Sequence, residues 1–390
     1  MNASVRIRLS ALMFLQYFAW GTWYVTLGTY LSEIGFDGLN IGDVFSASAW
    51  AALFSPIFVG MIADRYFSAQ NILSILYFCS SVALFWTSSQ TVPSAFFSSL
   101  LVTMACYMPT IPLSNAVCFH QMSNPSLLFP KIRLLGTIGW IVAGILVGTL
   151  GIEFTVYPMW IGVITLVLLG IYSLFLPETP PRMKNKVVRL KDVFGFDALR
   201  FFSDRSFLVF AIGSMLLTVP LAFYYNFANL FLNEVGLVNP AGTMTLGQMS
   251  EIIFMLLMPL FFRVFSIKSM LMIGMLAWVV RYFLFANGEL WMLYAGIILH
   301  GICYDFFFLT GQIYIDGRVG KNLRSSAQGL MTLLTYGIGM LGGAKVSGYV
   351  VNYFQIDGGH NWMMIWLCPA FMALSVLSLF ALLFKERHNV

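Results

Sequence analysis

The sequence predicts an all-α polytopic membrane protein with twelve transmembrane helices in two six-helix halves. Apolar residues make up 59% of the chain and charged residues only 9%, whereas a soluble domain carries about 45–50% and about 25%. The apolar residues fall in long runs, and lysine and arginine gather in alternate loops between them. Lipid offers no partner for an unpaired backbone group, so these runs must be helices.

Twelve apolar runs are long enough to cross a bilayer. We place them near residues 10–31, 41–63, 70–89, 93–117, 132–151, 156–176, 206–232, 245–262, 268–286, 290–313, 325–350 and 362–384. Residues 1–9 are too short and too polar for a signal peptide, so the first run is expected to remain as a helix.

The basic residues predict the orientation of the chain. Alternate loops contain no lysine or arginine, namely those near 32–40, 90–92, 152–155, 233–244, 287–289 and 351–361. The other loops and both ends of the chain are basic, which is the positive-inside pattern of cytoplasmic segments. We therefore expect an inner-membrane protein with both termini in the cytoplasm. The net charge of +5 follows from this topology and does not indicate nucleic-acid binding.

The longest loop divides the chain into an N-terminal six-helix half (1–176), a cytoplasmic linker (177–205) and a C-terminal six-helix half (206–390). A short internal repeat supports the division, because Arg65-Tyr-Phe-Ser after the second span is echoed by Arg263-Val-Phe-Ser after the eighth. Two repeated halves around a site near the bilayer midplane are the architecture expected of major facilitator transporters.

The loop after the second span reads Gly60-Met-Ile-Ala-Asp64-Arg65. It resembles the signature loop of the major facilitator superfamily, although the later glycine and paired basic residues of that signature are missing. The resemblance implies that Asp64 and Arg65 form a conformational latch with neighbouring helix ends. The alternative is that both charges only reach the membrane interface.

Ionisable residues inside the spans are candidates for a functional role, because inserting one at the centre of a transmembrane helix costs about 2.5–3.5 kcal/mol. Five qualify: Arg133, Glu251, Arg281, Asp305 and Lys345. In span five, Arg133, Thr137 and Trp140 share one helical face, where a cation, a hydroxyl and an indole can bind a planar ligand. Alternatively, Arg133 caps the cytoplasmic end of the helix.

Spans eight and ten carry the other candidate site residues. Gln248 and Glu251 share a face in span eight, and a carboxamide beside a carboxylate suits ribose hydroxyls. In span ten, His300 and Tyr304 share a face. Asp305 follows and precedes three phenylalanines, an apolar setting that favours the protonated carboxyl and suits a proton carrier. The alternative is that Arg281 forms an ion pair with Glu251 or Asp305.

Prolines mark two further features, a broken stretch in span four around Pro109 and Pro112 and a similar one at Pro220 in span seven. Motifs of soluble catalysis are missing, including the phosphate-binding Gly-x-x-x-x-Gly-Lys, His-Glu-x-x-His and Cys-x-x-Cys. The sequence thus predicts no enzyme, no cofactor and no metal site, and it favours a proton gradient over ATP as the energy source.

Several motifs together resemble the nucleoside:proton symporter family of the major facilitator superfamily along nearly the whole chain. They are Trp20-Gly-Thr-Trp23, Tyr107-Met-Pro-Thr, Phe129-Pro-x-Ile-Arg133, Gln248-x-Ser-Glu251, Tyr304-Asp305-Phe-Phe and Ser326-Ala-Gln-Gly. The resemblance implies substrate-binding roles for Arg133, Thr137, Trp140, Gln248, Glu251 and Tyr304, and proton coupling through Asp305.

This chain departs from a branch of that family at three positions. His300 stands where that branch has tyrosine, and Ala222 and Tyr225 stand where it has glutamine and asparagine. We therefore expect His300 and Tyr225 to contact the substrate and to alter which nucleosides are preferred.

The sequence thus predicts proton-coupled nucleoside import by alternating access. The expected partners are a nucleoside, a proton and the lipid bilayer, without nucleic acid, and the protein is expected to be monomeric. Two alternatives stay open, a sugar or glycoside symporter and a transporter-like receptor that binds without translocating.

Overall fold

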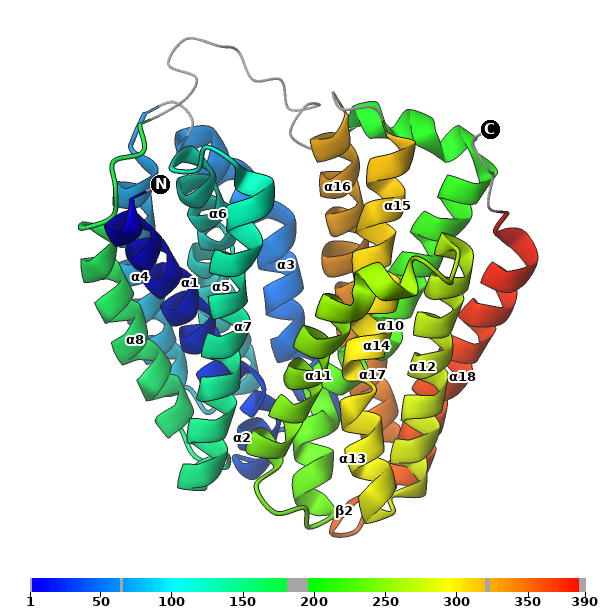
Figure 1. Cartoon of the computed structure of the whole chain (residues 1–390). Coiled ribbons are helices and arrows are strands. Elements are labelled where there is room, and N and C mark those ends of the chain that lie inside the picture. Colours follow the sequence, from blue (N-terminus) through cyan, green and yellow to red (C-terminus); the bar gives the residue numbers. More distant parts are fainter. Residues whose placement is uncertain (1, 64–65, 181–195, 320–322, 386–390) are drawn as a thin grey trace. The chain divides into compact units, whose positions relative to one another are not determined.

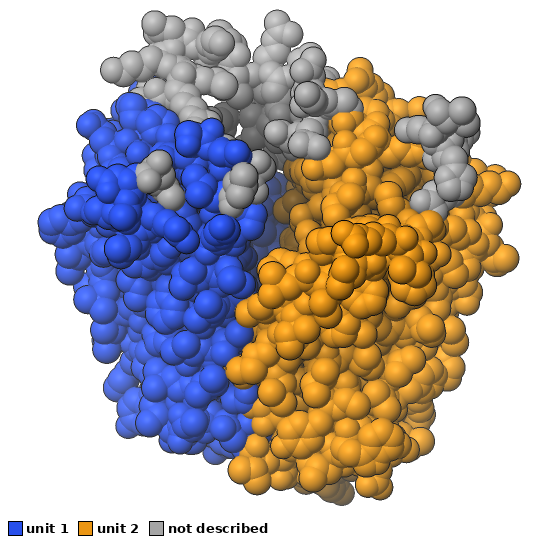
Figure 2. Space-filling view, viewed as in Figure 1, with its two compact units in different colours: residues 1–188, 239–242 blue, residues 189–238, 243–390 orange. Residues whose placement is uncertain are grey.

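The computed structural model describes residues 2–63, 66–180, 196–319 and 323–385, and most of these residues are helical. The chain divides into two compact units, shown in different colours in Figure 2. Unit 1 contains residues 1–188 and 239–242, and unit 2 contains residues 189–238 and 243–390.

Unit 1 is a helical bundle (Figure 1). Its helices are α1 (Ala3–Tyr24), α2 (Leu27–Glu33), α3 (Gly38–Ala63), α4 (Ala69–Ser88), α5 (Pro93–Tyr107), α6 (Thr110–His120), α7 (Pro125–Leu150) and α8 (Tyr157–Ser173). The main packed pairs are α1 with α7, α4 with α8 and α3 with α5.

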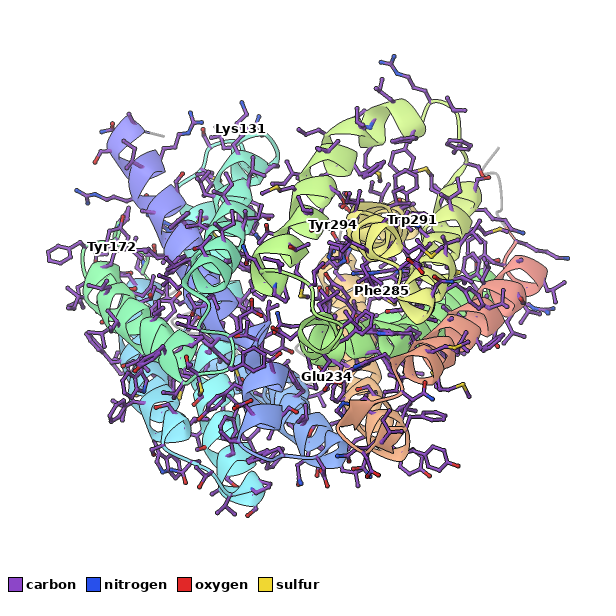
Figure 3. The ribbon with its side chains drawn as sticks, turned by 90° about the horizontal axis from the view of Figure 1, so that it is seen from below. Lys131, Tyr172, Glu234, Phe285, Trp291 and Tyr294 are labelled. Carbon is purple, nitrogen blue, oxygen red and sulfur yellow. The ribbon has the colours of Figure 1, made fainter. Side chains whose placement is uncertain are left out.

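Unit 2 is also helical, with one small hairpin. It contains η1 (Phe196–Ser203), α10 (Arg205–Glu234), α11 (Pro240–Phe261), α12 (Ile267–Asn287), α13 (Leu290–Ile298), α14 (His300–Tyr304), η2 (Asp305–Leu309), α15 (Thr310–Arg318), α16 (Arg324–Thr332), η3 (Leu333–Gly339), α17 (Met340–Tyr353), β1 (Gln355–Ile356), β2 (Gly359–His360) and α18 (Trp362–Leu383). The antiparallel hairpin β1–β2 contacts the end of α10, because Glu234, labelled in Figure 3, lies 2.8 Å from His360 Nδ1. Glu234 also accepts a hydrogen bond from Trp362 Nε1 of α18 at 2.8 Å.

The predicted fold class is confirmed. Among the described residues, the helical segments follow the twelve predicted spans in order. Eight segments are long and apolar enough by composition to cross a membrane, and α8 is a shorter apolar helix within the same described part of the chain. The two units also repeat the same helix pairing. In unit 1, span one packs against span five and span three against span six. In unit 2, the corresponding pairs are spans seven and eleven, and spans nine and twelve.

Within the described residues, four spans depart from a regular α-helix. The break predicted in span four is present, because α5 ends at Tyr107 and α6 begins at Thr110. Span one breaks between α1 and α2, and spans ten and eleven contain the π-helices η2 and η3. The break predicted in span seven is wrong. There, α10 runs through Pro220, whose carbonyl accepts a hydrogen bond from the Tyr282 hydroxyl at 2.6 Å.

Candidate substrate site

Unit 2 contains a cluster of polar side chains formed by Arg281, His300 and Glu251, and Arg281 is its buried cation. Arg281, on α12, has no exposed surface. Its guanidinium lies 3.6 Å from the centre of the Tyr224 ring, and its Nη1 contacts His300 Nδ1 at 3.0 Å. Phe285, labelled in Figure 3, lies one turn further along α12. The centre of its ring is 5.4 Å from the guanidinium. Aromatic faces attract a cation in this arrangement.

His300 stands between Arg281 and Glu251. Its Nε2 lies 3.9 Å from Glu251 Oε2, and the Glu251 side chain keeps 23% of its surface exposed. Gln248 is half-buried one turn before Glu251 on α11. The alternative ion pairs of Arg281 with Glu251 or Asp305 are not found, because Arg281 has no carboxylate within 4 Å among the described residues.

Two glycines bring His300 close to α11. A Cβ on Gly301 would lie 2.6 Å from the Ser250 carbonyl carbon, and one on Gly247 would lie 3.1 Å from His300 Cβ. Ser250 joins the helices by hydrogen bonds, donating from Oγ to the Ile298 carbonyl (2.6 Å) and accepting from the Gly301 N–H (2.9 Å). The separation between His300 and Glu251 is therefore set by backbone packing.

Aromatic rings pack against His300. Its ring stacks with that of Tyr224, at 5.3 Å between ring centres, and with that of Tyr304, at 5.9 Å. Tyr225, half-buried, places its ring 5.8 Å from that of Tyr224. The shared face predicted for His300 and Tyr304 is thus present, and Tyr225 lies beside it.

Tyr304 also contacts a residue that the sequence reasoning missed. Its hydroxyl lies 2.6 Å from the hydroxyl of Tyr336, which belongs to the π-helix η3. Both tyrosines border a small pocket of unit 2 with a volume of ≈ 60 Å³. A typical ligand site measures about 300–1,000 Å³, so this pocket suits a few water molecules and is too small for a nucleoside.

Asp305 begins the π-helix η2 and is only 2% exposed. Its Oδ2 has no hydrogen-bond partner within the described part of the chain. The next residue, Phe306, packs into an apolar cluster with Met258 and Met270. The apolar setting predicted for this carboxyl is therefore present, and π-helical turns are frequent at functional sites.

The candidate residues of unit 1 lie on α7. Arg133 is inside the helix and not at its end, and its guanidinium lies 3.9 Å from the centre of the Tyr17 ring of α1. Trp140 meets Trp20 edge to face at 5.6 Å. Thr137 is half-buried between these two positions. Asp64 and Arg65, the predicted latch, lie outside the described residues.

Close packing of α7 against α1 positions Arg133 and Trp140. A Cβ on Gly136 would lie 2.6 Å from the Tyr17 ring, and one on Gly21 would lie 3.1 Å from Trp140. Trp20, which contacts Trp140, has a buried Nε1 without a hydrogen-bond partner among the described residues. The indole N–H is a donor only, so Trp20 is a further candidate for contact with a ligand oxygen.

Comparison with known proteins identifies the family. The family model described as nucleoside H+ symporter matches residues 1–389. The chain belongs to this family. The Escherichia coli (strain K12) protein YegT is 40% identical over 401 residues, covering 98% of this chain and 94% of YegT. The xanthosine permease of the same strain is 33% identical, covering 99% of this chain and 97% of the permease.

Solved structures agree with the family assignment. The crystal structure of the nucleoside transporter NupG has a TM-score of 0.89 at 32% identity, covering 99% of this chain and 100% of NupG. A D-xylose–proton symporter matches with a TM-score of 0.73 at 13% identity, a likeness that shows the major facilitator fold alone. This nucleoside H+ symporter is therefore a multi-pass membrane transporter and not an enzyme.

Sequence reasoning on this symporter missed the aromatic partners of its charged residues. Tyr17, Tyr224 and Tyr336 were not among the predicted site residues. Tyr224 could have been found, because it lies at the centre of the aromatic run around Tyr225. Tyr17 and Tyr336 carry no distinguishing sequence signal, since each meets its partner only through helix packing.

Proposed function

We propose that this chain imports nucleosides together with protons across the bacterial inner membrane by alternating access. Membership of the nucleoside H+ symporter family supports the cargo and the coupling ion, as does the likeness to proteins named as a xanthosine permease and a nucleoside permease. The absence of lysine and arginine from alternate loops supports cytoplasmic termini. We expect the halves 1–176 and 206–390 to act as a monomer joined by the linker 177–205.

Each unit by itself contains proposed cargo contacts. In unit 1 they are Arg133, Thr137 and Trp140 on α7. In unit 2 they are Tyr225, Gln248, Glu251, His300 and Tyr304. The cation and the aromatic faces suit a nucleobase, which offers carbonyl edges and a planar ring. Glu251 and His300 suit hydroxyls, which both donate and accept hydrogen bonds.

The observation that supports coupling of nucleoside transport to proton movement is the environment of Asp305. This carboxyl is buried beside Phe306 and Phe307, and its Oδ2 has no hydrogen-bond partner among the residues that the structure describes. It lies five residues after His300 in the sequence. Burying an unpaired carboxylate is costly, so the neutral and charged forms of Asp305 favour different surroundings. Protonation then biases which conformation of the transporter is populated.

Uptake into proteoliposomes tests the proposal. Purified protein is reconstituted, an inward proton gradient is imposed, and uptake of labelled nucleoside is followed with and without a protonophore. Competition with free bases, ribose, maltose and nucleosides defines the cargo class. We expect protonophore-sensitive uptake that only nucleosides compete for. Competition by sugars alone would indicate a sugar symporter, and saturable binding without uptake would indicate a receptor.

A further inference from the structure

Arg281 is a buried cation whose surroundings are aromatic rather than acidic. Its Nε and Nη2 have no hydrogen-bond partner within the described residues, and the rings of Tyr224, Trp278 and Phe285 surround its guanidinium at 3.6–5.4 Å. Its Nη1 contacts His300 Nδ1 at 3.0 Å. A buried charge is costly, and this contact links the charge of Arg281 to the imidazole of His300.

The contact with Arg281 determines which nitrogen of His300 carries the hydrogen. A guanidinium has donors and no acceptor, so Nδ1 of His300 must accept. A neutral imidazole that accepts at Nδ1 carries its hydrogen on Nε2. The Nε2–H therefore faces Glu251, while stacking on Tyr224 and Tyr304 fixes the plane of the ring.

The distance between His300 and Glu251 suits one bridging hydroxyl. At 3.9 Å, Nε2 and Oε2 are too far apart to form a direct hydrogen bond. A hydroxyl oxygen can lie about 2.8 Å from both atoms, accepting from Nε2–H and donating to the carboxylate. In a deoxynucleoside a hydrogen atom replaces this hydroxyl and can form neither hydrogen bond. His300 and Glu251 together would therefore bind a ribonucleoside more tightly than the deoxynucleoside that lacks the hydroxyl.

We propose that Arg281 is a positioning residue for ribose recognition: it fixes His300 as an Nε2–H donor, and His300 with Glu251 binds one secondary ribose hydroxyl of the cargo. This inference rests on the proposed function. It also means that His300 and Glu251 together determine the preference for ribonucleosides over deoxynucleosides. Loss of Arg281 frees the other tautomer of His300, which would place a second acceptor opposite the carboxylate.

Binding measurements with deoxynucleosides test the inference. Affinities for a ribonucleoside and its 2′- and 3′-deoxy analogues are measured by calorimetry on purified protein. The hydroxyl bonds a charged group, so the analogue that lacks this hydroxyl should bind wild type about 10- to 100-fold more weakly than the ribonucleoside. This factor is the affinity ratio that the variants are compared by. His300→Gln, which can accept from Arg281 and donate toward Glu251, should keep most of this ratio. His300→Leu and Arg281→Met should reduce the ratio to about one.

Tyr282→Phe is the matched control. It removes a buried hydrogen bond from the same helix, the one to the Pro220 carbonyl, and keeps the side chains of Arg281, His300 and Glu251. It should lower thermal stability and leave the ratio unchanged. An unchanged ratio in Arg281→Met and His300→Leu would overturn the inference about Arg281. A wild type that binds no nucleoside would overturn the proposed function itself.

Nitrogen NMR of the imidazoles tests the tautomer directly in the wild-type protein. The chain contains only four histidines, and the His300→Gln spectrum assigns the signal of His300. We expect Nδ1 without hydrogen and Nε2 with hydrogen in the wild-type protein. Hydrogen on Nδ1, in either the neutral or the doubly protonated ring, would contradict the inference.

Discussion

Gly301→Ala separates the two helices that hold His300 and Glu251. The new Cβ would lie 2.5 Å from Ser250 Oγ, 2.6 Å from the Ser250 carbonyl carbon and 2.7 Å from the Glu251 nitrogen. Unstrained carbon contacts lie at about 3.5–4.0 Å, so α14 and α11 must move apart by about 1 Å. Two of these three atoms belong to the backbone and cannot rotate away. Overpacking of this kind costs about 1–3 kcal/mol.

The shift has a specific effect on the proposed site. Both hydrogen bonds of Ser250 across this contact, at 2.6 and 2.9 Å, would lengthen. The separation of His300 Nε2 and Glu251 Oε2 would grow beyond its 3.9 Å, so one hydroxyl could no longer bond both atoms. We expect ribonucleoside affinity to fall about tenfold or more, with a smaller effect on a free base.

The assay combines thermal unfolding in detergent with calorimetry of nucleoside and free-base binding. Gly329→Ala and Gly342→Ala are matched controls, because a Cβ at either position meets no atom within 4 Å. Each should leave binding intact and, by reducing backbone freedom in a helix, stabilise the protein by about 0.5–1 kcal/mol. Wild-type melting temperature and wild-type riboside affinity in Gly301→Ala would refute the reasoning.

Three further predictions concern coupling, recognition and topology. Asp305→Asn mimics the protonated carboxyl permanently, so it should bind nucleoside in calorimetry and fail to accumulate it in uptake assays. Protonophore-sensitive accumulation by this variant would exclude Asp305 as the carrier. Glu251→Gln should weaken riboside binding about tenfold while sparing a free base; equal losses for both ligands would argue against a ribose contact. Thiol labelling should place residues 177–205 in the cytoplasm and residue 357 outside, and cytoplasmic labelling at 357 would contradict the twelve-span topology.

The fold could be predicted because the bilayer restricts the possible structures. Apolar composition and alternate basic loops are enough to place helices in lipid. The helices follow the predicted spans in order, although α1 and α7 each begin seven residues before the predicted start. Breaks within spans were harder to predict. Pro109 marks a real break, whereas Pro220 lies in the continuous helix α10. The π-helices η2 and η3 depend on tertiary packing, which has no local sequence signal.

The candidate site could be predicted in part for a similar reason. Helical periodicity alone places His300 beside Tyr304, since those residues are four apart on one helix. Contacts between residues on different helices could not be predicted in this way. The sequence allowed Arg281 to pair with Glu251 or Asp305, and only the structure places His300 in contact with Arg281. Charge matching favoured an acidic partner, whereas the protein surrounds this arginine with aromatic rings.

Proton movement during nucleoside uptake tests the central claim most directly. Proteoliposomes with a trapped pH-sensitive dye receive an inward nucleoside gradient and no imposed proton gradient. If nucleoside and proton move together, the interior should acidify when nucleoside is added and stay unchanged when maltose is added. Liposomes containing Asp305→Asn should show no acidification. Labelled nucleoside entering wild-type liposomes without any acidification would contradict proton-coupled import.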